Sequence, residues 1–132
     1  MQVFDGNGKY ETKWNFLHRP CGLCRCGGKQ PTFIVGELGP GMPVNRKVPN
    51  LGPRLSIVDA RGNRIARLGG ENGPGVEPGK FLAPHGIATD SKGDIYLGEV
   101  GVTDWKTSFP DTPMPPEVAV SRCLQKLEKI PA

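Results

Sequence analysis

Four residues that can bind a metal ion or carry redox chemistry lie close together, in the order His18-x-x-Cys21-x-x-Cys24-x-Cys26. Imidazole and thiolate groups are the ligands that zinc prefers, and paired thiols can also form a disulfide. A single CxxC without a second pair leaves three alternatives open: structural thiols, a zinc or redox cluster, or a disulfide with Cys123. Cys24 and Cys26 are two residues apart on a predicted strand, so we expect both to point to the same face.

The only other histidine, His85, stands between Pro84 and Gly86, directly before a predicted strand. An imidazole at this position can bind a metal, or it can hydrogen-bond to water or to a neighbouring strand. An earlier copy of the same segment has Cys21 at the position equivalent to His85. His18 lies three residues before Cys21. His85 is therefore the candidate metal ligand, with Cys21 and His18 as additional candidates.

The segment around His85 repeats an earlier part of the chain. Pro20 lies 64 residues before Pro84, and Glu37 lies 62 residues before Glu99. Self-similarity at this spacing is typical of a repeat architecture. Both glutamates end matching strands, which favours a structural role common to every repeat over catalysis. We expect each carboxylate to accept hydrogen bonds from loop N–H groups of the next strand.

Each copy resolves into short strands, because apolar and polar residues alternate and turn-forming Gly and Asx residues separate the runs. With 19 Gly and 14 Pro in 132 residues, long helices are not expected. The one predicted helical turn covers residues 116–122. The predicted strands are residues 22–26, 32–38, 54–59, 64–68, 86–90, 94–100 and 123–130.

The predicted fold class is all-β, a partial β-propeller of about two and a half four-stranded antiparallel blades. Residues 1–14 supply the end of one blade, residues 20–70 one full blade with the long inserted loop 39–53, and residues 80–132 an incomplete last blade. Because so few blades do not close a ring, we expect a C-terminal fragment of a longer protein. A complete small domain is the alternative. We also expect Gly86 to permit close packing between strands at the channel.

Residues 84–99, Pro-His-Gly-Ile-Ala-Thr-Asp-Ser-Lys-Gly-Asp-Ile-Tyr-Leu-Gly-Glu, resemble the core of an NHL repeat. Over nearly the whole chain, the order HRPCGL, VGELGPGMPVNR, NLGPRLSIVDARGNRIARLGG and FLAPHGIATDSKGDIYLGEV is similar to bacterial relatives of the peptidyl-α-hydroxyglycine α-amidating lyases. Members of this family form closed six-bladed propellers, which the resemblance implies for the parent of this chain.

The same resemblance implies zinc as the cofactor, held in the central channel by histidines from different blades and acting as a Lewis acid during cleavage of a carbinolamide C–N bond. His85 stands in the Pro-His context that the family associates with one of these ligands. Calcium is the lesser alternative, because Gly86 stands where an acidic calcium ligand would be expected. The substrate would be a small molecule or derived from a peptide. The family's catalytic tyrosine and arginine have no assigned counterparts here.

The alternative function is a non-catalytic propeller scaffold that binds a protein or a small ligand through its loops. Two long segments, residues 39–53 and 103–116, connect the second and third strands of their blades, so we expect them on the same face of the ring. Arg46 and Lys47 of the first loop could there meet an anionic group. A third alternative is a sugar-lactonase-like hydrolase, whose metal shell would need carboxylates such as Glu37 or Glu99.

Composition limits the expected partners. The net charge of +4 comes from scattered basic residues with acidic residues between them, and aromatic residues suited to base stacking are lacking, so no nucleic-acid partner is expected. No apolar run approaches the roughly 20 residues of a membrane span, and the polar first residues do not match a secretory signal. We therefore expect a soluble chain with no membrane partner, in a compartment that the sequence leaves open. Its expected protein partners are the missing blades or a second copy of itself.

Overall fold

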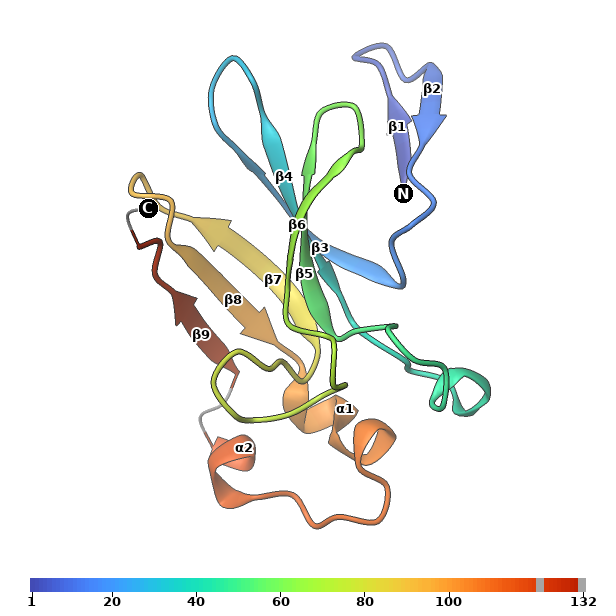
Figure 1. The fold of residues 1–132 in the computed structure, drawn as a ribbon, viewed down its shortest axis with the longest axis vertical. Helices are drawn as coiled ribbons and strands as arrows, with labels where there is room; N and C mark the ends of the chain where they lie inside the picture. Colours follow the sequence, from blue (N-terminus) through green and yellow to red (C-terminus); the bar gives the residue numbers. More distant parts are fainter. Residues whose placement is uncertain (121–122, 131–132) are drawn as a thin grey trace.

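The computed structural model describes residues 1–120 and 123–130, and this part of the chain forms three antiparallel sheets and two short α-helices (Figure 1). The first sheet is a hairpin of β1 (Gln2–Phe4) and β2 (Tyr10–Lys13). The second sheet contains, in spatial order, β3 (Pro20–Cys26), β4 (Thr32–Glu37), β5 (Arg54–Asp59) and β6 (Arg64–Leu68). The third contains β7 (Pro84–Thr89), β8 (Ile95–Glu99) and β9 (Leu124–Leu127).

The prediction of a mainly β fold is confirmed. Every strand pairs with its neighbours in the sequence, so each sheet is a simple antiparallel meander. Strands β5 and β6 have the predicted bounds, and the other predicted strands overlap the observed ones. The sheets contain two, four and three strands, which is the grouping expected from the repeat.

The same turn chemistry closes one hairpin in each sheet. Asp5, Asp59 and Asp90 each accept two backbone N–H groups with one carboxylate oxygen, from the residues two and four positions later, at distances of 2.8 to 3.0 Å. Such Asx turns hold a reversing chain by local hydrogen bonds. These aspartates are therefore turn residues in the structure. Asp5 and Asp59 close the last hairpins of their sheets, whereas Asp90 closes the first hairpin of the third sheet.

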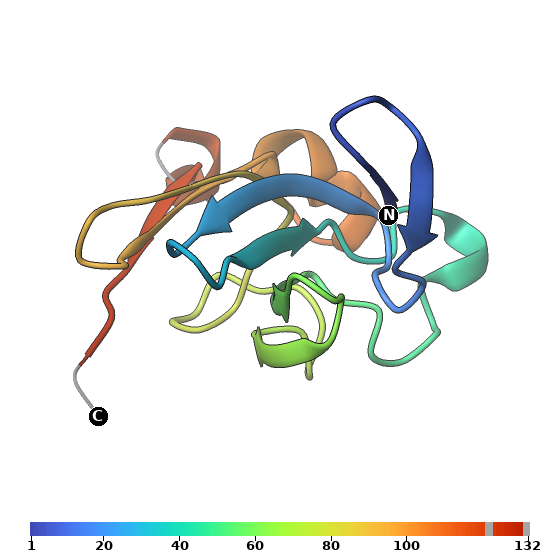
Figure 2. The same cartoon turned by 90° about the horizontal axis from the view of Figure 1, so that it is seen from above.

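The four-stranded sheet lies between the other two sheets (Figure 2). Toward the third sheet it buries a cluster of apolar residues, namely Ile34, Leu55, Phe81, Ile95 and Leu97. Toward the N-terminal hairpin it buries Trp14, Val35 and Val58. Side chains alternate between the two faces of a strand, so neighbours such as Leu55 and Ser56 belong to opposite layers. The central sheet is thus covered on both faces.

Strands β3 and β7 come into close backbone contact where the second and third sheets meet. A Cβ atom on Gly22 of β3 would collide with the backbone oxygen of His85. Gly86 stands at the equivalent position of β7, but a Cβ atom there would meet no atom within 4 Å. The expectation that Gly86 permits close packing is therefore wrong. The close approach depends on Gly22, because Gly22 faces β7 of the third sheet. Gly86, its equivalent in the repeat, faces no other sheet among the described residues.

The segment after β8 is more helical than expected. Helix α1 (Gly101–Ser108) occupies part of the predicted irregular loop, and α2 (Pro116–Val120) follows near the predicted helical turn, whose residues 121–122 lie outside the described residues. Trp105 of α1, Val118 of α2 and Leu82 form a small core of their own. Within the described ranges, neither helix is long and apolar enough to span a membrane.

Candidate functional site

His85 and Cys21 lie at equivalent positions on β7 and β3, and both are exposed to solvent. The contact between Gly22 and the His85 backbone brings these two strands side by side. The structure therefore places an imidazole and a thiol on adjacent strands, as the repeat implies. It does not bring a third ligand to them: among residues 1–120 and 123–130, no group of three or more His, Cys, Asp and Glu residues could hold a metal ion.

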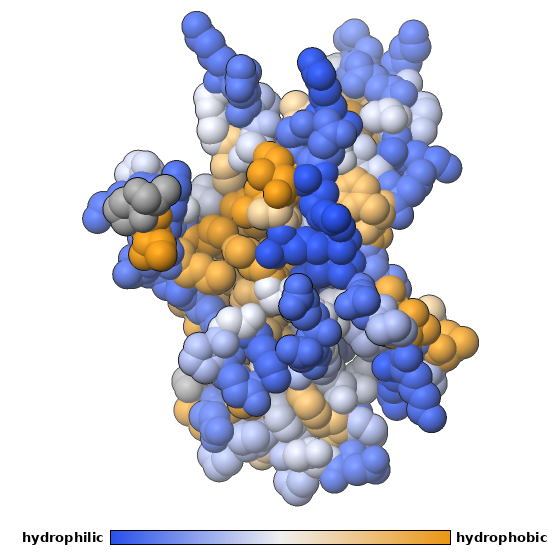
Figure 3. All heavy atoms as spheres, in the orientation of Figure 1, coloured by the Kyte–Doolittle hydropathy of each residue, from blue (hydrophilic) through white to orange (hydrophobic). Residues whose placement is uncertain are grey.

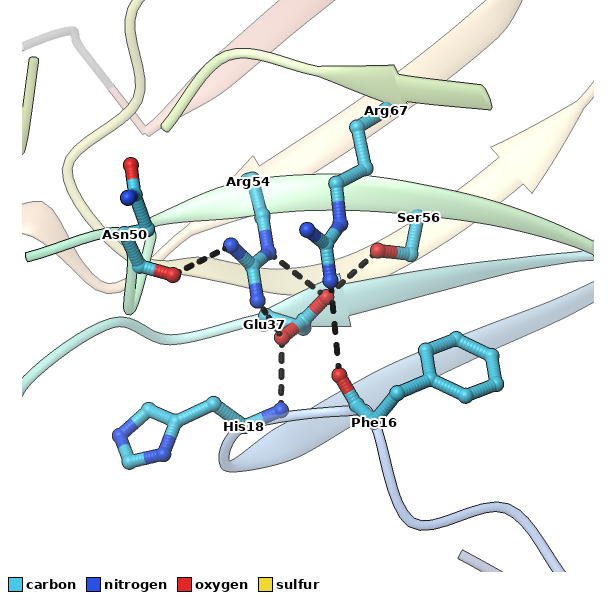
Figure 4. A network of polar contacts seen from close by, with 7 residues as sticks. All are labelled: Phe16, His18, Glu37, Asn50, Arg54, Ser56 and Arg67. Atoms are coloured by element: carbon cyan, nitrogen blue, oxygen red, sulfur yellow. Dashed lines mark hydrogen bonds and ion pairs between the residues drawn. The ribbon is translucent and has the colours of Figure 1, made fainter. Parts of the chain in front are cut away.

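His18 takes a different position from the other two candidates. Its backbone N–H donates a hydrogen bond of 2.6 Å to Glu37, and its side chain points away from that carboxylate (Figure 4). Its Nε2 atom is buried without a hydrogen-bond partner in the described structure. The role shown for His18 is therefore to help hold Glu37 through its backbone.

All four cysteines are free thiols, so the alternative of a disulfide with Cys123 is not observed. Cys24 and Cys26 do share one face of β3, where both pack against the core between the second and third sheets. Their sulfur atoms are 3.8 Å apart, and each lies near the hydroxyl of Thr89. Burial raises the pKa of the Cys26 thiol, with Thr89 opposing the shift and Cys24 adding to it. A raised pKa disfavours the thiolate that a metal needs, which favours structural thiols.

Glu37 lies at the centre of the most extensive polar network in the described structure, shown in Figure 4. Its side chain is fully buried. One carboxylate oxygen accepts hydrogen bonds from Arg54 Nε at 2.9 Å and Ser56 Oγ at 2.5 Å, and the other accepts from Arg54 Nη2 at 2.9 Å and from the backbone of His18. The remaining end of the guanidinium group donates to the carbonyl oxygen of Asn50 at 2.6 Å. Burial alone would raise the pKa of Glu37, but the hydrogen bonds from Arg54, Ser56 and His18 outweigh it and hold the pKa below its ordinary value.

Glu99 repeats this arrangement in the third sheet without a cation. Its carboxylate accepts the backbone N–H groups of Leu82 at 2.6 Å and Ala83 at 3.1 Å, and the side-chain amide of Gln125 at 2.5 Å. Gln125 occupies the position that Ser56 has in the second sheet. Both glutamates accept hydrogen bonds from loop N–H groups, as expected, but the donors precede β3 and β7, the first strands of the same sheets, and do not come from the next strand. With their oxygens occupied in this way, neither glutamate is placed to serve as a metal ligand of a lactonase-like site.

Arg67 adds a second cation to the Glu37 network. It lies on β6 opposite Ser56, and Figure 4 shows its guanidinium group beside that of Arg54. Its Nη2 atom is 3.5 Å from the carbonyl oxygen of Phe16, a long contact, and its Nε atom is buried with no partner among the described residues. Burial, followed by the charges of Arg54 and Arg64, lowers the pKa of Arg67, and Glu37 opposes this shift.

The two long loops lie at the end of the molecule where β4, β6 and β8 finish (Figure 1). The first contains a single 3₁₀ turn, η1 (Pro43–Asn45), and the second contains α1. Burial raises the pKa of Asp104 of α1, and the Ser108 hydrogen bond and the charges of Arg19 and Arg46 oppose this shift. A cavity of about 530 Å³ in the second loop is lined by residues 105–106 and 110–114, without any residue of the first loop.

Comparisons with protein-family models, with curated proteins and with solved structures found no match. The candidate site is therefore described by its own geometry. Sequence reasoning found His85, Cys21 and the two glutamates, but it did not find Arg54 and Arg67. A signal for them was present, because the predicted strands 54–59 and 64–68 flank a short turn, and their pairing places Arg67 opposite Ser56 on the face that carries Arg54.

Proposed function

We propose that the chain is part of an NHL-type β-propeller from a metal-dependent protein similar to the amidating lyases. In this proposal, β3 and β7 are the innermost strands of neighbouring blades and face a common channel. The stacking of successive antiparallel sheets supports the proposal, and so does the number of strands in each sheet. The observation that carries it is the exposed His85 on β7, directly beside β3.

The described residues do not complete a zinc site. A catalytic zinc ion normally has about three protein ligands and one open position, whereas His85 and Cys21 are the exposed candidates on the two strands. Further ligands would come from additional blades or from a second copy of the chain. Bound zinc would supply a Lewis acid to such a site. No step of the reaction is assigned to a residue of this chain beyond metal binding.

The proposed reaction cleaves a carbinolamide. In a peptidyl-α-hydroxyglycine, the bond between the α-carbon and the amide nitrogen breaks, and its electron pair goes to the nitrogen. The nitrogen gains a proton and the hydroxyl oxygen loses one, so the products are a primary amide and glyoxylate. No oxidant or reductant is needed, and glyoxylate gives a direct measure of turnover.

The test is release of glyoxylate from a peptidyl-α-hydroxyglycine by the zinc-supplemented complete propeller, which includes the blades that would supply the further zinc ligands. We expect release above the uncatalysed rate, loss of that release with a chelator, and loss of at least about a hundredfold in His85→Ala. His18→Ala is the matched control. It should retain activity, because His18 precedes β3 and its side chain is not at the position equivalent to His85. Absence of release by the wild-type protein, or unchanged release by His85→Ala, would overturn the proposal.

A second candidate is the non-catalytic scaffold, and the first long loop favours it. Met42, Val44 and Val48 expose 57%, 83% and 47% of their surface there. Several exposed apolar side chains on one loop are a common feature of contact surfaces for other molecules. This candidate predicts that removal of metal changes neither the folding nor the ligand binding of the protein.

A further inference from the structure

The Glu37 network contains more positive than negative charge. Arg54 and Arg67 both approach one carboxylate, and Arg54 alone already occupies both of its oxygens. Arg67 keeps only the long contact to Phe16, while its Nε atom is buried without an acceptor. Arg67 as a whole is half-buried, but a buried N–H group without an acceptor is costly, so its Nε atom calls for an acceptor that the described residues do not provide.

The third sheet shows that the glutamate can be held without an arginine at the position of Arg54. Glu99 is held by two backbone N–H groups and Gln125. The residue opposite Glu99 is Cys123, whose carbonyl oxygen accepts the Glu99 N–H, whereas the residue opposite Glu37 is Arg54. Arg54 is therefore an addition to the hydrogen-bonded glutamate that the two sheets share, and Arg67 lies on β6, a strand without a described counterpart in the third sheet.

The arginines line an open cavity of about 570 Å³ at the end of β6. A glycine-rich segment forms its wall, and Gly69 and Gly70 adopt positive φ angles of 73° and 90°. A Cβ atom on Gly70 would lie 2.9 Å from the Arg54 side chain, so the absence of a side chain lets the segment approach the arginine closely. The volume is that of a typical site for a small organic ligand.

Two further charged residues line this cavity. Lys80 adds a cation, which forms a partly exposed ion pair of 3.5 Å with Glu77. Glu71 is the one acidic residue in the lining, and it is exposed. Because Arg54 is paired with Glu37 and Lys80 with Glu77, Arg67 is the cation of the lining that forms no ion pair with another described residue, and it is the group that favours an anion.

We propose that this cavity binds a small organic molecule through a phosphate or carboxylate group, with Arg67 as the principal donor. A guanidinium group presents paired N–H donors that match two oxygens of either group. The apolar part of the ligand would lie against Leu68, Phe81 and Leu127, which line the same cavity. This site is distinct from the exposed position of His85 and does not depend on the proposed lyase activity.

The test titrates inorganic phosphate and malonate separately into the full chain, at an ionic strength held constant with chloride, and follows binding by calorimetry. We expect saturable binding of at least one anion, weakened at least about tenfold in Arg67→Gln. Arg64→Gln is the matched control: it removes an exposed arginine from the same strand and should change the affinity by less than about twofold. Glu71→Gln should bind the anion more tightly, because it removes the competing negative charge.

A second readout keeps the test valid if Arg67→Gln alters stability. An anion that binds only the folded state raises the denaturant concentration at the unfolding midpoint. We expect phosphate or malonate to raise this midpoint for wild type and Arg64→Gln, but not for Arg67→Gln. Binding of phosphate alone would identify a phosphorylated ligand, and binding of malonate alone a carboxylate. No saturable binding of either anion, or equal weakening by both arginine variants, would overturn the proposal.

Discussion

Glu37 and Glu99 occupy matching positions, but their partners differ in charge. Glu37 is fully buried and pairs with Arg54, which is only 5% exposed, whereas Glu99 accepts hydrogen bonds from neutral groups. Removal of one partner of a buried ion pair leaves the other charge uncompensated, which costs more than loss of a neutral hydrogen bond. The two residues therefore allow a comparison between a buried glutamate held by an ion pair and one held by neutral hydrogen-bond donors.

We predict that Glu37→Gln lowers the free energy of unfolding by about 3 to 5 kcal/mol, because it leaves the buried guanidinium group of Arg54 without a carboxylate. The matched variant Glu99→Gln should cost about 1 to 3 kcal/mol. Denaturant unfolding of both variants and wild type measures the difference. Equal costs at the two positions would contradict the ionic role assigned to Glu37.

The pH dependence of the same variants provides a control. The pKa of Glu37 is lowered in the folded protein, so its contribution to stability is fully present above its ordinary value of 4.5 and is lost as the pH falls through the folded value. The stability difference between wild type and Glu37→Gln should therefore narrow below pH 4.5. A difference that stays constant with pH would show that the carboxylate charge is not responsible.

At the scale of elements, the contact between β3 and β7 joins the second and third sheets. Gly22 allows the backbones to meet, and Gly36 of β4 lies nearby, where a Cβ atom would be 3.1 Å from the backbone oxygen of Pro84. Both glycines belong to the second sheet and face β7. The junction between the sheets is thus built from glycines of β3 and β4 on one side and, on the other, from residues 84–85 of β7, where the pairing of β7 with β8 shifts register.

We predict that Gly22→Ala lowers the free energy of unfolding by about 1 to 3 kcal/mol, because the added methyl group forces β3 and β7 apart. Gly86→Ala, at the equivalent position of β7, should change it by less than about 0.5 kcal/mol, since space is open there. Thermal or denaturant unfolding distinguishes the two variants. A tolerated Gly22→Ala would mean that the two strands do not pack as described.

The elements differ in how far they can be predicted from sequence. Strands β5 and β6 are marked by alternation and by an intervening turn, and both signals are local. Helix α1 is short and contains Val102 and two threonines, so its intrinsic helix preference is low. The helix is instead held by burial of Trp105 against distant residues, which no local pattern reveals.

The same distinction applies to the candidate site. The role of the glutamates follows from their repetition along the chain, so it could be predicted. Convergence of Arg54 and Arg67 on Glu37 requires the register of three paired strands, which fixes which side chains share a face. The packing role expected of Gly86 failed for a related reason: the repeat identifies equivalent positions, but not which copy faces a neighbouring sheet.

At the scale of the whole molecule, the three sheets follow one another and the central sheet is covered on both faces. The third sheet leaves apolar side chains accessible where it diverges from the second, and Figure 3 shows them gathered between β6 and β9. This opening, with a volume of about 680 Å³, includes Ile57, Leu68 and Leu127 in its lining. Sheets that meet at their first strands and separate toward their last strands suit the arrangement of blades around a channel.

The central proposal is that β7 presents His85 to a metal in such a channel, and the measurement that tests it most directly is the zinc content of the complete propeller, whose other blades would supply the further ligands. Wild type and His85→Ala should be equilibrated with zinc, freed of unbound metal, and assayed by mass spectrometry. We predict bound zinc in the wild-type protein and its loss in His85→Ala, with the circular dichroism spectrum unchanged. A wild-type protein without zinc, or a variant that retains as much zinc as wild type, would contradict the proposed metal site.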